Sequence, residues 1–437
     1  MKSIWAKSVN RKQFDSLSND IKTDVLIVGG GMAGILCAHK LKKQGASCVL
    51  VEADRILGGV TENTTAKITV QHGLIYDDII SKYGVDAAKK YLMAQQDALN
   101  SYKELCQNID CDFKIQDAFV YSLRNTDKLE REISAYKKIG LNYKYLKSVE
   151  LPVNTSGAVC VANQAQFNPL KFALSLTDEL TIYEKTKVIE LFPGGAITDK
   201  GKVYAEKIII ATHFPFINKF GAYFLKMYQH RSYVIALEKA KIPNGMYIDE
   251  DEKGLSFREY NGLLLLGGGS HRTGKNGGNW KELRNFAAKY YPNSKEVAHF
   301  ATQDCMTLDG IPYIGLYSKR LPNVYVATGF NKWGMTSSMA AATILADMIN
   351  GKDNVYADVF SPQRSILHSQ LAINMTETFF NFITPTVPRC PHLGCALKYN
   401  FAEHSWDCPF HGSHFAENGK RIKNPATGEW KKNRQSK

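Results

Sequence analysis

The first regular pattern in the chain is a short apolar run, followed by glycines and then by apolar residues at helical spacing. Residues Thr23–Val28 read as a buried strand, and the apolar positions from Ile35 to Leu41 recur as one face of a helix does. A second β-rich run, Cys48–Val51, ends at Glu52. The pattern predicts a strand–helix–strand unit.

Three glycines join this strand to the helix in the order G-x-G-x-x-G, at Gly29, Gly31 and Gly34. In a dinucleotide site the first permits a tight turn, the second lets the backbone approach the pyrophosphate, and the third lets helix and strand pack closely. The helix N-terminus stabilises the phosphates. Glu52 can accept hydrogen bonds from ribose hydroxyls and would repel a 2′-phosphate. The spacing predicts a dinucleotide site, with a glycine turn that binds no ligand as the alternative.

Later segments alternate apolar and polar residues, as half-exposed strands do. They are Phe113–Leu123, Tyr228–Leu237, Met246–Asp249, Ser256–Tyr260 and Gly262–Gly267. We expect them to form a second, antiparallel sheet. The glycines Gly267, Gly268, Gly269 and Gly274 lack the spacing of a second nucleotide motif, and we interpret them as a turn.

Segments around this sheet resemble the glycine oxidase/D-amino-acid-oxidase superfamily of FAD-dependent oxidoreductases, from Ile4 to Arg364. In chain order they are Gly58–Gly59, Thr64–Lys67, Gln71–Gly73, Lys202–Thr212, Thr307–Gly315 and Val324–Thr336. The resemblance implies FAD as cofactor, with a helix N-terminus near the flavin that stabilises its anionic reduced form. Together with the glycine motif, it implies that FAD is bound by Gly29, Gly31, Met32, Ala33, Gly34, Glu52, Ala53, Gly59, Thr65, Ala66, Val188, Ala211, Thr212, Gly329, Trp333, Gly334, Met335 and Thr336.

Three residues are candidates for catalysis or substrate contact. Arg258, in an expected strand beside Tyr260, is the best cation for gripping a carboxylate, and a solvent-facing arginine is the alternative. The resemblance brings Lys67 and His72 near the flavin, with an ordinary surface or hydrogen-bonded residue as the alternative for each. A covalent flavin link at His72 is chemically possible, but nothing in the sequence singles it out. For Trp333, core packing is the alternative.

After Arg364 the chain changes character. Residues Ser365–Phe382 have a helical pattern, and two short motifs follow, Cys390-Pro-His392-Leu-Gly-Cys395 and Cys408-Pro-Phe-His411-Gly-Ser413. Each motif supplies one cysteine and one histidine. A Rieske [2Fe–2S] centre takes two cysteines on one iron and two histidines on the other, so both loops would clamp one cluster. A structural zinc ion is the competing interpretation, although a C-x-H half-site is unusual for a zinc finger.

The flanking residues resemble the Rieske family, which implies that Ser413 hydrogen-bonds a bridging sulfide. The chain departs from the respiratory members at two places. Phe410 stands where they carry a second cysteine, so Cys395 has no disulfide partner, and Phe415 replaces a tyrosine that hydrogen-bonds a ligand sulfur. Fewer such bonds predict a cluster potential in the lower part of the family's window of roughly −150 to +300 mV.

The stretch between Arg364 and Cys390 is too short for the sheet base that precedes the ligand loops of a full Rieske domain. A unit this small needs its metal or a neighbour to hold it. We therefore expect this unit to pack against the FAD domain or against a partner subunit. His404 and His414 lie nearby without ligand spacing, and we interpret them as surface residues.

Composition adds few constraints. The 437 residues are 44% hydrophobic and 22% charged, which is ordinary for a globular protein. The nine cysteines show no repeated spacing before the motifs, which argues against a disulfide framework. No apolar run approaches the roughly 18 residues that span a bilayer, and the N-terminus lacks a secretory apolar stretch. We expect a cytoplasmic protein without a membrane span.

The net charge of +13 could reflect nucleic acid, an anionic membrane or an acidic protein partner. A local excess of basic residues follows the last cysteine, at Lys420, Arg421, Lys423, Lys431, Lys432, Arg434 and Lys437. We interpret it as a solvated tail, with a docking patch for an acidic electron-transfer partner as the alternative. We do not expect nucleic-acid binding.

These patterns predict an α/β protein with two parts. Residues 1–364 form a Rossmann-like FAD domain, with FAD-binding parts at about 20–75, 150–215 and 302–352. Its inserted antiparallel-sheet substrate side takes about 76–149 and 216–301. Residues 365–388 form a helical linker, and residues 389–437 form a small β-type, truncated Rieske unit.

The expected function is that of a flavin-dependent oxidoreductase. It passes electrons between a small organic substrate and a one-electron partner, such as a ferredoxin- or flavodoxin-like protein, through the cluster. The resemblance makes an amine or amino acid the expected substrate, and the direction of flow stays open. The alternatives are an oxidase that uses O₂ with a structural cluster, and a redox carrier or sensor without small-molecule turnover.

Overall fold

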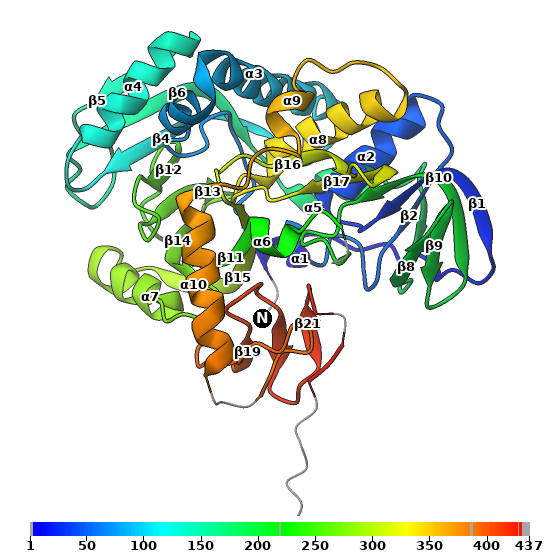
Figure 1. The fold of residues 1–437 in the computed structure, drawn as a ribbon. Helices are drawn as coiled ribbons and strands as arrows, with labels where there is room; N and C mark the ends of the chain where they lie inside the picture. Colours follow the sequence, from blue (N-terminus) through cyan, green and yellow to red (C-terminus); the bar gives the residue numbers. More distant parts are fainter. Residues whose placement is uncertain (1–2, 218–219, 385–387, 427, 431–437) are drawn as a thin grey trace, which may run out of the picture.

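The computed structural model describes residues 3–217, 220–384, 388–426 and 428–430, and Figure 1 shows its fold. The first sheet contains the expected nucleotide unit. Five strands pair in parallel, in the order β17 (Leu321–Thr328), β10 (Lys202–Ile210), β1 (Ile21–Val28), β2 (Cys48–Val51) and β7 (Thr181–Tyr183). At the edges lie β16 (Tyr313–Ser318), antiparallel to β17, and the hairpin of β8 (Val188–Phe192) and β9 (Gly195–Thr198), which joins β10.

Helices α2 (Met32–Lys43) and α8 (Gly334–Ile349) pack against each other beside this sheet. Their apolar residues join those of β1 and β2 in one large core. Short elements complete this part: α1 (Ile4–Lys7), η1 (Thr61–Asn63), α5 (Pro169–Ser175), α6 (Tyr223–Lys226) and α9 (Ala357–Phe360).

The second sheet has nine strands, nearly all antiparallel. Their order is β15 (Lys295–Thr307), β11 (Met227–Glu238), β14 (Leu263–Arg272), β13 (Ser256–Tyr260), β12 (Met246–Asp249), β4 (Lys114–Ser122), β6 (Gly157–Gln166) and β3 (Lys67–Ile68), with β5 (Lys144–Leu146) on β6. Helices α3 (Tyr76–Leu105) and α4 (Asp127–Ile139) pack together beside β6, and α7 (Asn279–Tyr290) packs on β14. The strands expected at Met246–Asp249 and Ser256–Tyr260 have the predicted bounds.

The glycines that we interpreted as a turn divide between two structures. Gly274 does lie in a turn, but Gly267, Gly268 and Gly269 lie inside β14, so the prediction is wrong for these three. The pairing of β14 with β11 shifts register beside them, and Gly269 takes a φ of +61°. The glycines therefore mark an irregularity of the kind found at β-bulges, where extra residues need unusual backbone angles.

The C-terminal unit lies below the second sheet in Figure 1, next to β11 and β15. Helix α10 (Ser369–Ile383) leads into it, and four short strands form its sheet: β18 (Lys398–Asn400), β19 (Ser405–Asp407), β20 (His414–Ala416) and β21 (Arg421–Lys423). All neighbours in this sheet are antiparallel. Among the described residues, no helix combines the length and the apolar character needed to cross a membrane.

Candidate functional site

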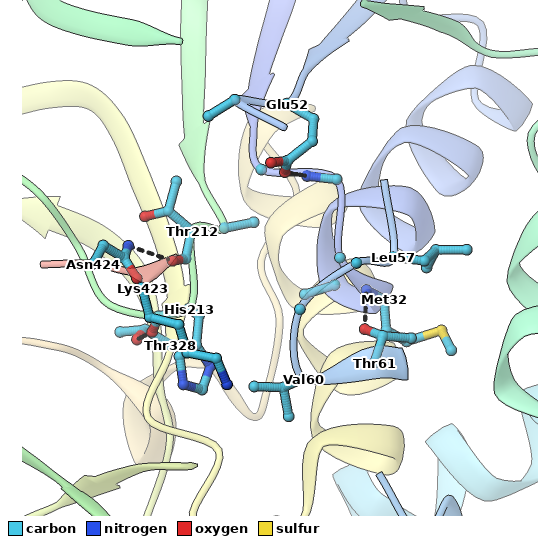
Figure 2. A pocket seen from close by; sticks show the side chains of 18 of the residues that line it. Met32, Glu52, Leu57, Val60, Thr61, Thr212, His213, Thr328, Lys423 and Asn424 are labelled. Atoms are coloured by element: carbon cyan, nitrogen blue, oxygen red, sulfur yellow. Dashed lines mark hydrogen bonds between the residues drawn. The ribbon is translucent and has the colours of Figure 1, made fainter. Parts of the chain in front are cut away.

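A cavity of about 450 Å³ opens where β1, β2 and β10 end, and Figure 2 shows it from close by. Ligands of parallel α/β sheets bind at the carboxyl ends of the strands. The predicted FAD residues that line this cavity are Gly29, Gly31, Met32, Ala33, Glu52, Ala53, Gly59, Val188, Ala211, Thr212, Gly334 and Met335. Thr65 and Trp333 line a neighbouring cavity. Gly34, Ala66, Gly329 and Thr336 line neither.

The backbone geometry at the glycine motif needs residues without side chains. Gly29 has a φ of +111°, and a Cβ atom there would lie 2.6 Å from the Ala211 carbonyl oxygen. A Cβ at Gly34 would overlap the carbonyl oxygen of Gly29. At Gly31 the nearest atom would be Thr61 Oγ1, 3.7 Å away, so this glycine leaves space on the cavity side. The motif thus provides a tight turn and an open cradle.

Glu52 is held in place by backbone donors. Its carboxylate accepts hydrogen bonds from the amides of Gly30 at 2.8 Å and Asp54 at 2.9 Å. Burial raises the pKa of Glu52 above its ordinary value, while these two N–H groups act in the opposite direction. The carboxylate is therefore fixed at the end of β2, where a ribose would be recognised.

Two further features fit FAD. The buried Nε2 atom of His213 has no hydrogen-bond partner among the described residues, and His213 lines the cavity beside Thr212. Helix α8 begins at Gly334, and both Gly334 and Met335 line the two cavities. The N–H groups of this helix end therefore face the place where the cavities meet, a favourable environment for negative charge on a bound flavin.

The neighbouring cavity has a volume of about 530 Å³ and lies between β3, β11 and β15. Asp304 and Lys332 line both cavities. Acidic residues outnumber basic ones along its wall; they are Asp78, Asp249, Glu250, Asp251, Glu252, Asp304 and Asp309, against Lys67, Lys82 and Lys332. Burial raises the pKa of Asp249 to about 6.

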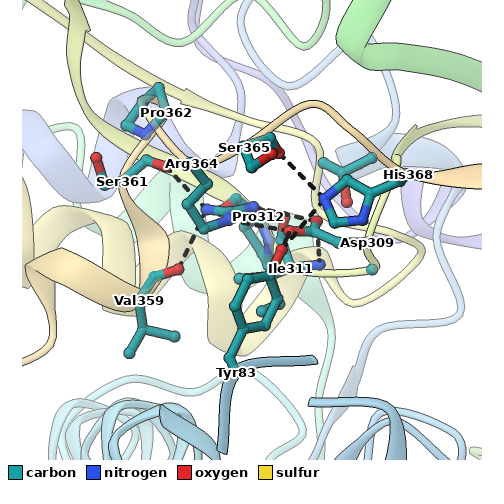
Figure 3. Close-up of polar contacts among 12 residues, drawn as sticks. Tyr83, Asp309, Ile311, Pro312, Val359, Ser361, Pro362, Arg364, Ser365 and His368 are labelled. Atoms are coloured by element: carbon teal, nitrogen blue, oxygen red, sulfur yellow. Dashed lines mark hydrogen bonds and ion pairs between the residues drawn. The ribbon is translucent and has the colours of Figure 1, made fainter. Parts of the chain in front are cut away.

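Asp309 belongs to a network that fastens the end of the FAD domain (Figure 3). Arg364 donates to both of its carboxylate oxygens, at 3.0 and 3.1 Å, and to several backbone carbonyls including that of Ile311. The Tyr83 hydroxyl donates to the same carboxylate at 2.8 Å. Burial opposes the charge of Asp309, but Arg364 holds its pKa below the ordinary value. The Asp309 carboxylate is thus charged and has a structural role, because it binds Arg364 and Tyr83.

Lys67 lines the second cavity from β3. Its amino group lies 3.5 Å from the Thr65 hydroxyl, and no carboxylate of the described residues lies within ion-pair distance of it. Burial, together with repulsion from Arg258, lowers the pKa of Lys67 to about 7. This amine can therefore lose its proton near neutral pH.

His72 also lines the second cavity, but both of its ring nitrogens are engaged. Nδ1 lies 2.7 Å from the Tyr91 hydroxyl, and Nε2 lies 2.9 Å from Thr336 Oγ1. The ring stacks on Trp333, with 4.9 Å between ring centroids. Burial lowers the pKa of His72 to about 3, so the ring stays neutral. Its contacts position Trp333 and the start of α8, and leave neither nitrogen available for a flavin link.

Arg258 lies in β13, as predicted, but the solvent-facing alternative is wrong. Its side chain is fully buried and donates to Gln166 Oε1 at 2.9 Å, to the Phe167 carbonyl at 3.0 Å and to the Thr65 carbonyl. It lines neither cavity. The guanidinium is occupied by β6 and by the segment before β3, so its position gives no support to a role in gripping a substrate carboxylate.

The two ligand loops of the C-terminal unit are built alike. In the first, the Cys390 amide donates to the Cys395 carbonyl at 2.8 Å; in the second, the Cys408 amide donates to the Ser413 carbonyl at 2.8 Å. Gly394 and Gly412 occupy the same place in the two loops, with φ of +79° and +77°. Each loop is therefore a tight turn that carries one cysteine and one histidine.

The four predicted ligands meet as two pairs. His392 Nδ1 lies 3.2 Å from His411 Nδ1, and the Cys390 and Cys408 thiols contact each other; the Cys408 thiol also contacts that of Cys395. The pKa of Cys390 is raised by that thiol contact and by burial, while a hydrogen bond from Ser413 lowers it. No group of three or more His, Cys, Asp or Glu residues in the described ranges surrounds a single metal position. Separate pairs of thiols and imidazoles fit a diiron cluster.

Contacts with the FAD domain orient the second loop. His411 Nε2 donates to the Phe224 carbonyl at 2.9 Å, which fixes the ring proton on Nε2 and leaves Nδ1 free to bind iron. Gln229 Nε2 donates to the His411 carbonyl at 2.5 Å, and Gln303 Nε2 donates to the Gly412 carbonyl at 2.6 Å. The cluster loop therefore rests on strands β11 and β15.

A buried ion pair adds to this interface. Arg231 of β11 forms two hydrogen bonds with the Glu403 carboxylate, which also accepts from the Tyr233 hydroxyl at 3.0 Å. The side chains of Arg231 and Glu403 are only 4% and 11% exposed. Burial alone would raise the pKa of Glu403, but Arg231 lowers it. Both groups are therefore charged inside the interface.

Two interpretations of the C-terminal unit need correction. His404 is exposed, as expected, but His414 is buried, with Nδ1 2.9 Å from an Asp407 carboxylate oxygen. The basic excess is not simply a solvated tail either. Lys420 is exposed, but Arg421 and Lys423 line the first cavity. Lys431, Lys432, Arg434 and Lys437 lie outside the described residues.

Several site residues were missed from the sequence. Gln229 and Gln303 gave no signal, because they contact the cluster loop across more than 100 positions of the chain. Asp304, Lys332 and Lys423 belong to no local motif. At Asp304, a charged residue within an apolar strand pattern could have indicated a functional position.

Comparisons with known proteins give a family match for each of the two parts of the chain. Residues 24–348 match the family of FAD dependent oxidoreductases, and residues 366–433 match the Rieske [2Fe-2S] domain. The "Putative Rieske 2Fe-2S iron-sulfur protein YhfW" of Bacillus subtilis (strain 168) is 34% identical, and the alignment covers 97% of this chain and 96% of that protein.

Two more distant similarities concern the FAD domain. Gamma-glutamylputrescine oxidoreductase of Escherichia coli (strain K12) is 23% identical, over 80% of this chain and 89% of that protein. The crystal structure of glycine oxidase from Geobacillus kaustophilus superposes with a TM-score of 0.66 at 19% identity, covering 79% of this chain and 99% of that one, which shows a shared fold. The predicted fold class, FAD and the [2Fe–2S] cluster are thereby confirmed. This chain belongs to the FAD dependent oxidoreductase family and carries a Rieske [2Fe-2S] domain at its C-terminal end.

Proposed function

We propose that this enzyme oxidises a small organic amine in the second cavity and delivers the electrons singly, through the cluster, to a protein partner. Bound FAD would accept two electrons from the substrate, and the cluster would carry one at a time. The partner is expected to be a ferredoxin- or flavodoxin-like protein. His392 is only partly buried and its neighbour Leu393 is 40% exposed, which supports this loop as the docking point.

One observation carries the link between the two cofactors. Gln303 and Asp304 are consecutive in β15, and consecutive side chains of a strand point to opposite faces. Gln303 donates to the cluster loop at Gly412, while Asp304 lines both cavities. The cluster loop and the flavin cavity would thus be neighbours across a single strand, an arrangement suited to electron exchange within the chain.

The acidic wall of the second cavity supports a cationic substrate. An ammonium group would be attracted by its excess of carboxylates, and a carboxylate substrate would be repelled. Arg258, the only candidate that we had for gripping a carboxylate, is bonded elsewhere. That a relative is named gamma-glutamylputrescine oxidoreductase agrees with an amine substrate.

Lys67 supports the same chemistry. An amine binds as its ammonium form and must lose a proton before oxidation. A neutral lysine in the cavity could accept that proton, and the pKa of Lys67, lowered to about 7 by burial and Arg258, provides a neutral amine at physiological pH. We therefore assign Lys67 as the proposed general base.

The test is an anaerobic titration of the purified protein with a panel of amines and amino acids. We expect a diamine or monoamine to bleach the flavin absorbance and to produce the EPR signal of the reduced cluster. Amino acids should reduce the flavin more slowly. Bleaching without any cluster signal would favour the O₂-using oxidase, and an unchanged flavin across the panel would favour the carrier or sensor.

A further inference from the structure

The wall of the FAD cavity contains a segment from the cluster unit. Residues Arg421, Ile422, Lys423 and Asn424, which are β21 and the residue after it, all line this cavity (Figure 2). The Asn424 side-chain amide donates to the carbonyls of Thr212 and Phe214, both at 3.0 Å. These two carbonyls belong to the turn after β10, on the FAD domain. The segment is therefore fastened to the cavity wall.

Lys423 is the notable residue of this segment. Within the described part of the chain, no carboxylate lies within ion-pair distance of the Lys423 amino group, and this amino group makes no hydrogen bond. Burial lowers the pKa of Lys423 to about 8, with a further contribution from Arg231, while the carboxylates of Glu403, Asp304 and Asp407 act in the opposite direction. A cation inside a protein is costly unless an anion or hydrogen bonds compensate it. The Lys423 amino group therefore has no direct ionic partner in the described residues, and an anionic ligand of the cavity can supply one.

The position of Lys423 within the cavity follows from its charged neighbours. Burial raises the pKa of Asp304, while Lys332 and Lys423 act in the opposite direction. Asp304 and Lys332 line both cavities and so mark the junction between them. If the second cavity takes the substrate, as in the proposed function, the residues at this junction would hold the flavin ring of a bound FAD. Figure 2 shows Lys423 beside His213, across the cavity from Glu52.

We propose that Lys423 is a FAD-contacting residue supplied by the cluster unit, and that FAD binding is thereby coupled to the docking of that unit. Lys423 lies in β21, whose partner β20 directly follows the second ligand loop. Coupling free energies are reciprocal, so FAD strengthens docking as much as docking strengthens FAD binding. The inference rests on the proposed function only in taking the second cavity as the substrate side; it does not depend on which substrate binds or on the direction of electron flow.

The test compares Lys423→Met with Lys423→Arg, which keeps the charge, and with Lys420→Met, which removes an exposed lysine of the same unit. Flavin-stripped protein is titrated with FAD, and the midpoint potential of the bound flavin is measured. Loss of a charged contact should weaken FAD binding of Lys423→Met by roughly ten- to a hundredfold. Its flavin potential should become more negative, because a cation near the ring favours the reduced anion. Lys423→Arg and Lys420→Met should stay close to the wild type.

The coupling has its own readout. Cys408→Ser should remove the cluster and loosen the unit, so FAD should bind more weakly, and adding Lys423→Met in that background should have little further effect. The proposal is overturned if Lys423→Met leaves both the FAD affinity and the potential unchanged. It is also overturned if the effects of Cys408→Ser and Lys423→Met on the dissociation constant simply multiply. The cluster EPR spectrum of each Lys423 variant verifies that the unit is folded.

Discussion

The FAD domain buries a large apolar core that spans both of its sheets, whereas the core of the cluster unit has, among the described residues, eight members, three of them cysteines. The large domain can therefore hold its site by packing and backbone geometry, as the glycine turn at Gly29 illustrates. The small unit depends on polar contacts with strands β11 and β15 and on its cluster. Small domains with too little apolar area need such additional support.

The two parts also differ in what they contribute to the candidate sites. The FAD domain encloses two adjoining cavities, with a lysine of lowered pKa in the second. The cluster unit presents its ligand loop to β15 and its strand β21 to the FAD cavity. The large domain therefore carries both candidate sites for FAD and substrate, and the small unit packs on it through polar contacts.

The largest effect should come from removing a cluster ligand. Cys408→Ser should abolish the cluster absorbance and EPR signal, and it should make the C-terminal unit sensitive to protease, because metal binding supplies folding energy to small domains. The matched control is Cys395→Ser, which replaces a buried free cysteine of the same unit. Loss of the cluster in Cys395→Ser but not in Cys408→Ser would contradict the ligand assignment.

The next effect concerns chemistry confined to the large domain. Flavin reduction by an amine should become faster as the pH rises through about 7, because Lys67 accepts a proton only after it has lost its own. Lys67→Met should lower the rate by roughly 100-fold and flatten this profile. Rapid-mixing absorbance measurements across the pH range provide the check, with the exposed Lys89→Met as control. A profile that falls with rising pH would exclude this role.

A third effect concerns the interface between the two parts. Arg231→Met leaves the Glu403 carboxylate buried without its cation, which should destabilise docking of the cluster unit by about 3–5 kcal/mol. The double variant Arg231→Met/Glu403→Gln should recover part of this loss. Denaturant unfolding of the wild type, the two single variants Arg231→Met and Glu403→Gln, and the double variant gives the coupling energy between the two side chains. A coupling near zero, typical of exposed pairs, would mean that the ion pair does not hold the unit.

The smallest expected effect is a difference in stability between alanine variants at two glycines with similar backbone angles. A Cβ at Gly274 would lie 2.6 Å from Pro409 Cβ, in the cluster loop, whereas a Cβ at Gly351 would meet nothing within 4 Å. Their φ angles are +80° and +69°, so alanine is strained at both. Gly274→Ala should therefore cost about 1 kcal/mol more than Gly351→Ala, through crowding. Equal melting temperatures for the two variants would argue against tight packing there.

The sequence allowed prediction where neighbours along the chain make the structure. The strand, turn and helix around Gly29–Gly34 and the two ligand loops are local, and each motif contains its own geometry. Arg258 illustrates the limit, because its partners are Thr65, Gln166 and Phe167, and only the folded sheet brings them together. Lys423 was placed in a solvated tail for the same reason. A charge excess alone does not reveal that one lysine turns into a cavity.

His414 shows a second limit. A histidine without ligand spacing looks like a surface residue, and its buried contact with Asp407 arises from pairing between β19 and β20. The glycines of β14 show a third, since an irregular register in a strand and a turn share the same residue type. In each of these cases the deciding partner lies on another strand.

We propose that the two cofactors exchange electrons within one chain. The most direct measurement reduces the bound flavin with a light flash under anaerobic conditions and follows flavin and cluster together. We predict that the cluster becomes reduced as the flavin is reoxidised, with a first-order rate that stays constant over a tenfold dilution of the protein. A cluster that remains oxidised, or a rate that falls in proportion to the protein concentration, would contradict the account.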